Sequence, residues 1–189
     1  MGALASMVEA VLFSAAEPVP VERLAQVLAT TVPLARQALS ELGAHLDAHG
    51  HAIGLVEIAG GFQLLTRGEY AGIVARMTAA KPVPLSRAAL ETLAIVALRQ
   101  PITRAAIDEL RGVHSDGAVA TLVERGLISE KGRSNGPGRA FLYVTTERFL
   151  QHFGLRSIQD LQGELPESLV ESLQTASHRP RRLFQRDLP

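Results

Sequence analysis

The sequence contains no cysteine, which excludes disulfide bonds and any chemistry that needs a thiolate. It also lacks an apolar run of the roughly 20 residues that a membrane-spanning helix needs. Met1–Ala16 is apolar, but Glu9 interrupts it and no basic segment precedes it, so we do not expect a signal peptide. Together these absences predict a soluble, cytoplasmic protein that does not associate with a membrane.

An excess of positive charge is absent as well, because 19 lysines and arginines are balanced by 19 aspartates and glutamates. Residues 1–78 carry 4 basic and 7 acidic side chains, and residues 79–165 carry 11 and 9. A module that binds phosphate backbones usually shows a strong positive excess. The charge balance therefore disfavours direct nucleic-acid binding as the main role.

Patterns typical of enzymes are missing too. The glycine-rich stretch Gly132–Arg139 lacks the Gly-Lys-Ser/Thr ending of a phosphate-binding loop. His45, His49 and His51 form a cluster, and the first two have the spacing that places metal ligands on one helix face. Only Asp47 accompanies them, so we interpret the cluster as a polar helix end. We predict no catalytic residues, no metal, no cofactor and no enzymatic activity.

The most informative stretch is Leu85–Thr146, where three helical patterns precede two strand-like runs joined by a glycine-rich turn. Ser86 and Thr103 are placed to cap the first two helices. Gly112 and Gly126 suit the left-handed conformation that ends the second and third. The order helix-helix-helix-strand-strand predicts a winged-helix module.

The first part of the chain repeats this module weakly. A shift of 83 residues places Pro18 on Pro101 and Gly43 on Gly126, whereas the wings match at a shift of 79. The four extra residues fall near Ala44–Gly50, which predicts a longer third helix in the first copy.

The repeat predicts a mostly α fold with small β wings (α+β) and two tandem winged-helix domains. We place an N-terminal domain at residues 1–80 and a proline-rich linker at 81–84. A C-terminal domain at 85–165 and a disordered tail at 166–189 complete the predicted organisation.

Winged helices ordinarily bind DNA by placing the third helix in the major groove. In the second module this helix is predicted at Ser115–Arg125, with its first residue as the cap. Its outward face offers one arginine against two carboxylates, with Asp116 at the end that normally meets the groove. The wing carries Lys131, Arg133 and Arg139, which we interpret as a solvated hairpin. A DNA-binding transcriptional regulator is therefore the alternative hypothesis.

The first helix of each module is apolar almost all round, at Met7–Phe13 and at Leu90–Leu98. A helix that buries one stripe shows a polar face as well. Either neighbouring elements cover these helices or a partner does, and we favour protein interfaces.

Specific motifs lie in the second module: LSRAALETLAI at Leu85–Ile95, QPITR at Gln100–Arg104, RGVHSD at Arg111–Asp116 and PGR at 137–139. On these motifs, and on VEAVLFSAAEPV in the first module, the sequence resembles the bacterial segregation and condensation protein B family. The resemblance extends over about Leu4–Leu161.

The resemblance implies a non-catalytic subunit that forms a homodimer, chiefly through the first domains. It implies binding to segregation and condensation protein A (ScpA), the kleisin, and through it to the ATPase of a structural-maintenance-of-chromosomes (SMC) complex. The implied role is chromosome condensation and partition during the cell cycle and cell division. The implied location is the nucleoid, in the cytoplasm, where the protein would associate with DNA mainly through its partners. The residues expected to bind the partner are Gln100, Pro101, Arg111, Val113, Ser115, Asp116, Pro137 and Arg139. The residues expected in the dimer interface are Met7, Val8, Val11 and Leu12.

Overall fold

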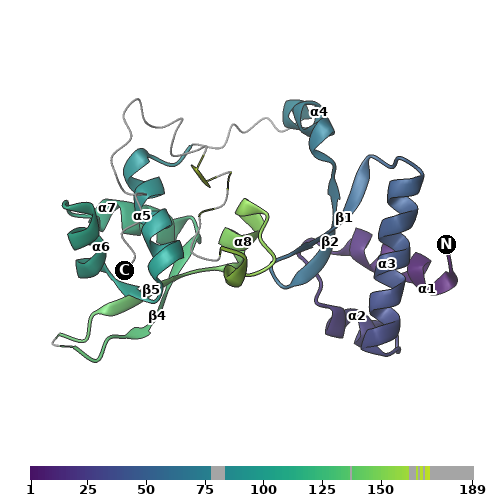
Figure 1. Cartoon of the computed structure of the whole chain (residues 1–189), viewed down its shortest axis with the longest axis horizontal. Coiled ribbons are helices and arrows are strands. Elements are labelled where there is room, and N and C mark those ends of the chain that lie inside the picture. The colour runs from purple at the N-terminus through teal and green to yellow at the C-terminus, as the bar shows by residue number, and fades with distance from the viewer. Residues whose placement is uncertain (78–83, 137, 162–164, 166, 168, 171–189) are drawn as a thin grey trace, which may run out of the picture. The chain divides into compact units, whose positions relative to one another are not determined.

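The computed structural model describes residues 1–77, 84–136, 138–161, 165, 167, 169 and 170 (Figure 1). Most of the predicted linker, Pro137 and most of the predicted tail lie outside the described residues. The chain divides into two compact units. Unit 1 comprises Met1–Val83 with Gly154–Ser157, and unit 2 comprises Pro84–Phe153 with the residues from Ile158 onward.

Unit 1 is a three-helix domain with a β-hairpin and a short closing helix. The hairpin is antiparallel and pairs Ile53 with Thr66 and Ile58 with Gly61. The third helix is longer than its counterpart in unit 2, as the repeat predicts. The elements are α1 (Ala3–Ser14), α2 (Val21–Val27), α3 (Val32–Ala48), β1 (Ile53–Ile58), β2 (Gly61–Thr66), the 3-10 helix η1 (Gly68–Tyr70) and α4 (Ala71–Met77).

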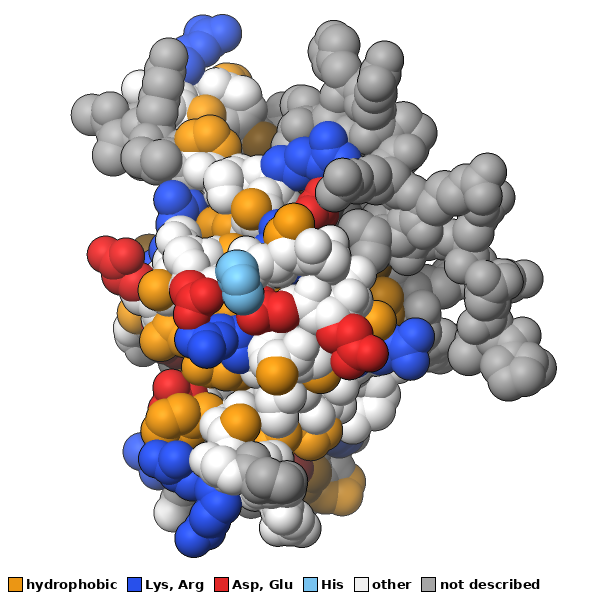
Figure 2. Space-filling view, turned by 90° about the vertical axis from the view of Figure 1, so that its left-hand side faces the viewer, with side chains coloured by type: hydrophobic (Ala, Val, Ile, Leu, Met, Phe, Trp, Pro, Cys, Tyr) orange, Lys and Arg blue, Asp and Glu red, His pale blue; other side chains and the backbone are white. Residues whose placement is uncertain are grey.

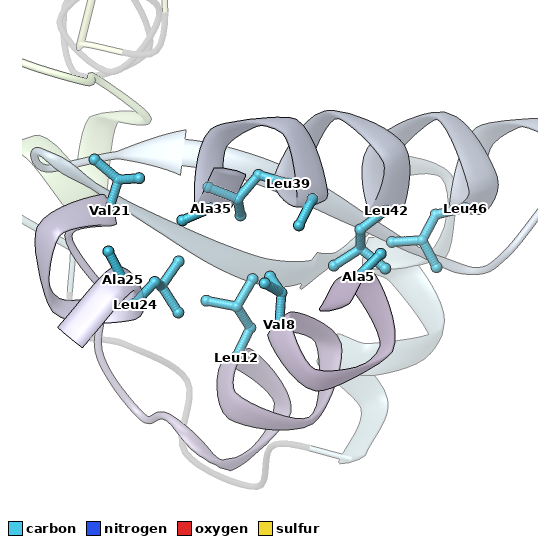
Figure 3. Packing of buried hydrophobic residues seen from close by; sticks show 11 residues of the cluster. Ala5, Val8, Leu12, Val21, Leu24, Ala25, Ala35, Leu39, Leu42 and Leu46 are labelled. Atoms are coloured by element: carbon cyan, nitrogen blue, oxygen red, sulfur yellow. The ribbon is translucent and has the colours of Figure 1, made fainter. Parts of the chain in front are cut away.

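The core of unit 1 is formed where α1, α2 and α3 meet over the hairpin (Figure 3). On α1 the buried residues are Ala5, Val8 and Leu12, whose spacing of three and four forms a single stripe. Leu39 and Leu42 of α3 point into the same core. α1 begins after Gly2 and has no side-chain cap.

The hairpin of unit 1 is tied to the segment before α2. Val19 and Phe62 exchange two backbone hydrogen bonds of 2.9 Å. A Cβ atom on Gly61 would lie 2.8 Å from the carbonyl carbon of Val19, so this approach requires glycine. Val19 aligns with Ile102 in the repeat, and Ile102 pairs with Tyr143 of the second wing. In each module, the segment before the second helix therefore pairs with the second strand of the wing.

Unit 2 contains the three helices and the wing predicted for Leu85–Thr146. A two-residue strand between the first two helices, which the sequence analysis did not anticipate, completes a three-stranded sheet in the order β3-β5-β4. The elements are α5 (Arg87–Arg99), β3 (Ile102–Thr103), α6 (Arg104–Arg111), α7 (Asp116–Glu124), β4 (Ile128–Arg133), β5 (Phe141–Thr145), α8 (Glu147–Phe153) and the 3-10 helix η2 (Ile158–Leu161). The mostly α fold with small β wings is confirmed.

Helix α5 corrects one expectation. Its Thr92 and seven of its apolar residues are buried, and the helix packs against α6, α7 and β5. Neighbouring elements of the chain thus cover its apolar surface, and a partner interface is not needed to explain it. Ser86 and Thr103 cap α5 and α6 as predicted, by accepting hydrogen bonds from the backbone N–H groups of Ala89 and Ala106. In the part of the chain that the structure describes, no helix combines the length and apolarity needed to cross a bilayer.

Candidate partner-binding surface

The turn between α6 and α7 is held by one carboxylate. Asp108 Oδ1 accepts a hydrogen bond of 2.8 Å from the backbone N–H of Ser115 and another from the Ser115 hydroxyl. Ser115 is only 1% exposed and stands at the N-cap position of α7, but its side chain makes no capping bond. Its hydroxyl donates to Asp108 instead. Ser115 therefore occupies the predicted cap position, but the prediction that its side chain caps the helix is wrong. Ser115 shapes the turn from inside and offers no surface to a partner.

The hydrogen bonds from Ser115, led by that of its hydroxyl, hold the pKa of the Asp108 carboxyl below its usual value. His114 adds to the effect, with Nδ1 3.6 Å from Asp108 Oδ2. Ligand atoms of Asp108, His114 and Asp116 lie within 4.8 Å of one another. Both carboxylates already have partners in the chain, because Asp116 forms an ion pair with Arg104. The group is a hydrogen-bonded turn.

Arg111 also lies inside the module. Its side chain is 5% exposed, and one guanidinium nitrogen lies 3.6 Å from Glu91 Oε2 on α5. Glu91 is held in turn by Arg87, at 2.9 Å. The Arg111 Nε–H is buried and has no partner among the described residues. This ion pair connects α6 to α5. Arg111 therefore does not contact a partner directly, and it affects the exposed residues of α6 only by fixing the position of that helix.

Gln100 and Pro101 fasten the end of α5 to the wing. Gln100 Oε1 accepts hydrogen bonds from the backbone N–H and the hydroxyl of Thr145, at 2.7 and 3.0 Å. The peptide bond between Gln100 and Pro101 is cis, and Pro101 itself is exposed. Gln100 therefore has a fold-keeping role, whereas Pro101 is accessible.

Two exposed members of the predicted partner set, Val113 and Asp116, lie at the α6–α7 turn. Val113 is 50% exposed, next to Leu110 at 48%, and Asp116 is exposed beside them in the chain. Figure 2 shows this face of unit 2, with carboxylates around a histidine and with lysine and arginine side chains scattered over the face. We call Leu110, Val113 and Asp116 the turn surface. It combines apolar side chains with negative charge.

The wing forms a second, basic surface. Lys131, Arg133 and Arg139 are all exposed. The Arg133 guanidinium lies 3.9 Å from the centre of the Phe141 ring, and it donates a hydrogen bond to the Arg139 carbonyl oxygen. Arg139 has a φ of 44°, in the left-handed region. The wing tip is thus shaped by contacts among its own residues, and Pro137 lies outside the described residues.

The residues predicted for the dimer interface separate into two groups. Val8 and Leu12 are 0% and 2% exposed and belong to the core of unit 1, so their side chains are not available to a second chain. Met7 is 54% exposed and Val11 is partly buried. The sequence marked α1 as apolar, but it did not distinguish its core stripe from its outer face.

A more exposed apolar surface lies on α4. Every residue of α4 is exposed. Ile73 is 65% and Met77 89% exposed, and Figure 1 shows α4 standing apart from α1, α2 and α3 within unit 1. With Val74 at 41%, three large apolar side chains are thus exposed on a helix of seven residues.

The two modules, each with three helices and a wing, define a tandem winged-helix protein whose exposed surfaces suit protein partners. A family model described as segregation and condensation complex subunit ScpB matches residues 6–164. Segregation and condensation protein B of Desulforamulus reducens is 44% identical over 166 residues, which cover 88% of this chain and 91% of that protein. The Syntrophotalea carbinolica protein of the same name is 48% identical over 160 residues, covering 84% and 80%.

Among solved structures, one described as a dimer of the ScpB N-terminal domain complexed with an ScpA peptide is 31% identical. The match covers 41% of this chain and all of that one, with a TM-score of 0.38. The family match and the curated relatives identify the chain: it belongs to the ScpB family of segregation and condensation complex subunits. Its role is that of a structural subunit in an SMC-type chromosome segregation complex.

Proposed function

We propose that this chain forms a homodimer through unit 1 and binds the kleisin ScpA, which connects it to the SMC ATPase at the nucleoid. Membership of the ScpB family carries this proposal, because the family's members are subunits of the segregation and condensation complex. The proposed division of labour keeps the predicted boundaries, with a dimerising domain at 1–80, a linker at 81–84 and a kleisin-binding domain at 85–165.

The turn surface is the proposed kleisin contact in unit 2. Exposed Leu110 and Val113 supply apolar area, and the exposed ion pair between Asp116 and Arg104 supplies polar groups at its edge. The partly buried pairs Asp108–Ser115 and Glu91–Arg111 connect this surface to the rest of unit 2. A fixed surface loses little conformational entropy on binding, which favours affinity.

Helix α4 is the proposed centre of the dimer contact in unit 1, together with Met7 on the outer face of α1. Isolated helices shorter than about 12 residues are marginal in water, and α4 has only seven residues. Burying Ile73 and Met77 against a second copy removes their exposed apolar area from water. The proposed interface therefore replaces Val8 and Leu12, which belong to the core, with residues that are exposed.

A calorimetric titration with purified ScpA tests the kleisin contact. The chain is expected to bind one kleisin per two copies, and Val113→Glu is expected to weaken binding by tenfold or more, about 1.4 kcal/mol. Val113 is exposed, so the variant should keep its fold and its melting temperature.

Val27→Glu is the matched control, because Val27 is 49% exposed but lies on α2 of unit 1. It should bind the kleisin like the parent chain. Equal affinities for the two variants would remove the turn surface from the proposal. Absence of binding by the folded parent chain would reject the kleisin proposal itself.

A further inference from the structure

Three histidines converge at the C-terminal end of α3. His45 and His49 lie one helical turn apart, with ring centres separated by 4.1 Å. His51 follows the helix, and its ring centre lies 5.9 Å from that of His45 and 6.4 Å from that of His49. The sequence predicted a polar helix end here because it could not show that the chain folds His51 back onto the helical pair.

The backbone that carries these rings is fixed from both sides. The His51 backbone N–H donates to the Leu46 carbonyl oxygen at 3.1 Å, which closes the helix end. Arg67, after β2, donates from Nε to the His51 carbonyl oxygen at 2.8 Å and forms an ion pair of 2.5 Å with Asp47. The charge of Arg67 is thus balanced by a carboxylate at the same helix end.

Hydrogen bonding and charge prepare the rings to act as ligands. His49 Nδ1 lies 2.8 Å from the His45 carbonyl oxygen, which can only accept, so Nδ1 carries the proton and Nε2 keeps its lone pair. An N–H···O=C bond of this kind orients histidine ligands in metal sites. The negative end of the α3 dipole favours a cation here.

Two imidazoles that share a tetrahedral ion have ring centres about 5 Å apart, given metal–nitrogen distances of about 2.0 Å. The His45 and His49 rings are closer than this, at 4.1 Å, whereas the His51 ring lies farther away, at 5.9 and 6.4 Å from the other two. The exposed His51 ring therefore has to turn toward the helical pair to complete the site. We propose that His45, His49 and His51 bind one borderline divalent transition-metal ion, such as Zn²⁺, at the end of α3. The ion joins the helix end to the turn that leads into β1.

Titration of the full chain with Zn²⁺ against a chromophoric chelator tests this site. One ion per chain is expected, with a dissociation constant below about 100 µM, and Zn²⁺ at saturating concentration should raise the melting temperature. His49→Ala removes an exposed ligand and should weaken binding by at least tenfold. His51→Ala, which keeps the helical pair, should weaken it by about tenfold. His45 is partly buried, so it is replaced by glutamine, which keeps more of the side-chain volume than alanine. His45→Gln should also weaken Zn²⁺ binding by at least tenfold.

His114→Ala is the matched control, because His114 is an exposed histidine beside the carboxylates Asp108 and Asp116. It should bind Zn²⁺ like the parent chain. Retained affinity in His49→Ala combined with lost affinity in His114→Ala would overturn the proposal and place the ion at the α6–α7 turn. Absence of binding below millimolar Zn²⁺ by the folded parent chain would overturn it as well. Circular dichroism melts without metal confirm that each variant is folded.

Discussion

Asp108 determines the shape of the α6–α7 turn. Its carboxylate accepts from both the backbone and the hydroxyl of Ser115 and lies beside His114. Hydrogen bonds to a charged acceptor are stronger than those between neutral groups. The turn that presents Val113 is therefore stabilised by one side chain of the preceding helix.

This arrangement predicts an acid-dependent loss of stability. The pKa of Asp108 is lowered in the folded chain, so its charged form stabilises the fold above the unfolded-state pKa. That contribution disappears as pH falls through the folded-state pKa. Asp108→Asn should melt below the parent chain near pH 7, and the difference should shrink as the pH is lowered toward 3. Thermal melts by circular dichroism across that range measure it.

Glu109→Gln serves as the reference for Asp108→Asn, because Glu109 is the exposed neighbour on the same helix. Its melting temperature should follow that of the parent chain at each pH. If Asp108→Asn instead shows the same deficit at pH 3 as at pH 7, the turn depends on the shape of the side chain and not on its charge.

At the scale of elements, α4 and α5 show how an apolar helix acquires its role from its surroundings. α5 is apolar almost all round and is covered by α6, α7 and β5. α4 is short, and every one of its residues is exposed. The sequence predicts a protein interface on α5 and does not single out α4, because only the packing of the rest of the chain shows which apolar helix is already covered.

The exposure of α4 predicts that Ile73→Asp separates the homodimer into monomers. A carboxylate buried in an apolar contact without a partner costs about 2 kcal/mol or more, which corresponds to about a 30-fold weaker association. Light scattering or sedimentation at micromolar concentration should show the mass of the parent chain halved in this variant. Because Ile73 is 65% exposed, the monomer should remain folded.

Val27→Asp provides the comparison for Ile73→Asp, since Val27 is a similarly exposed aliphatic residue of unit 1 that lies on α2. It should leave the mass unchanged. A folded Ile73→Asp variant that stays dimeric would exclude α4, and the same measurement on Met7→Asp would then test the outer face of α1.

At the scale of the whole molecule, the sequence predicts the fold well because the signals are local. The caps Ser86 and Thr103, the left-handed Gly112 and the proline near the start of α3 each act within one helical turn. The site is harder to predict, because surface exposure depends on long-range packing. Arg111 and Ser115 look like surface residues in the RGVHSD motif, yet Glu91 and Asp108 hold them inside. Strand β3 has two residues and gives no periodic pattern.

The distribution of charge over the molecule distinguishes the complex subunit from a DNA-binding regulator. DNA affinity comes largely from neutralised phosphates, and a DNA-reading winged helix needs cations on its third helix. On α7, Asp116 and Glu124 are exposed, and Asp116 is paired with Arg104. The cations gather instead on the wing of unit 2, whose Arg133 packs on Phe141.

The combined substitution of Lys131, Arg133 and Arg139 by alanine tests the role of the wing. Because the wing tip is held by contacts among its own residues, kleisin binding in calorimetry should change by less than about threefold, or 0.7 kcal/mol. Any weak DNA binding by the parent chain should fall, and its decline with salt should become less steep, since three phosphate contacts are lost. A folded variant that no longer binds the kleisin would instead make the basic wing part of the kleisin interface. In that case the acidic turn surface and the basic wing would contact the same partner, and the partner would need charges of both signs.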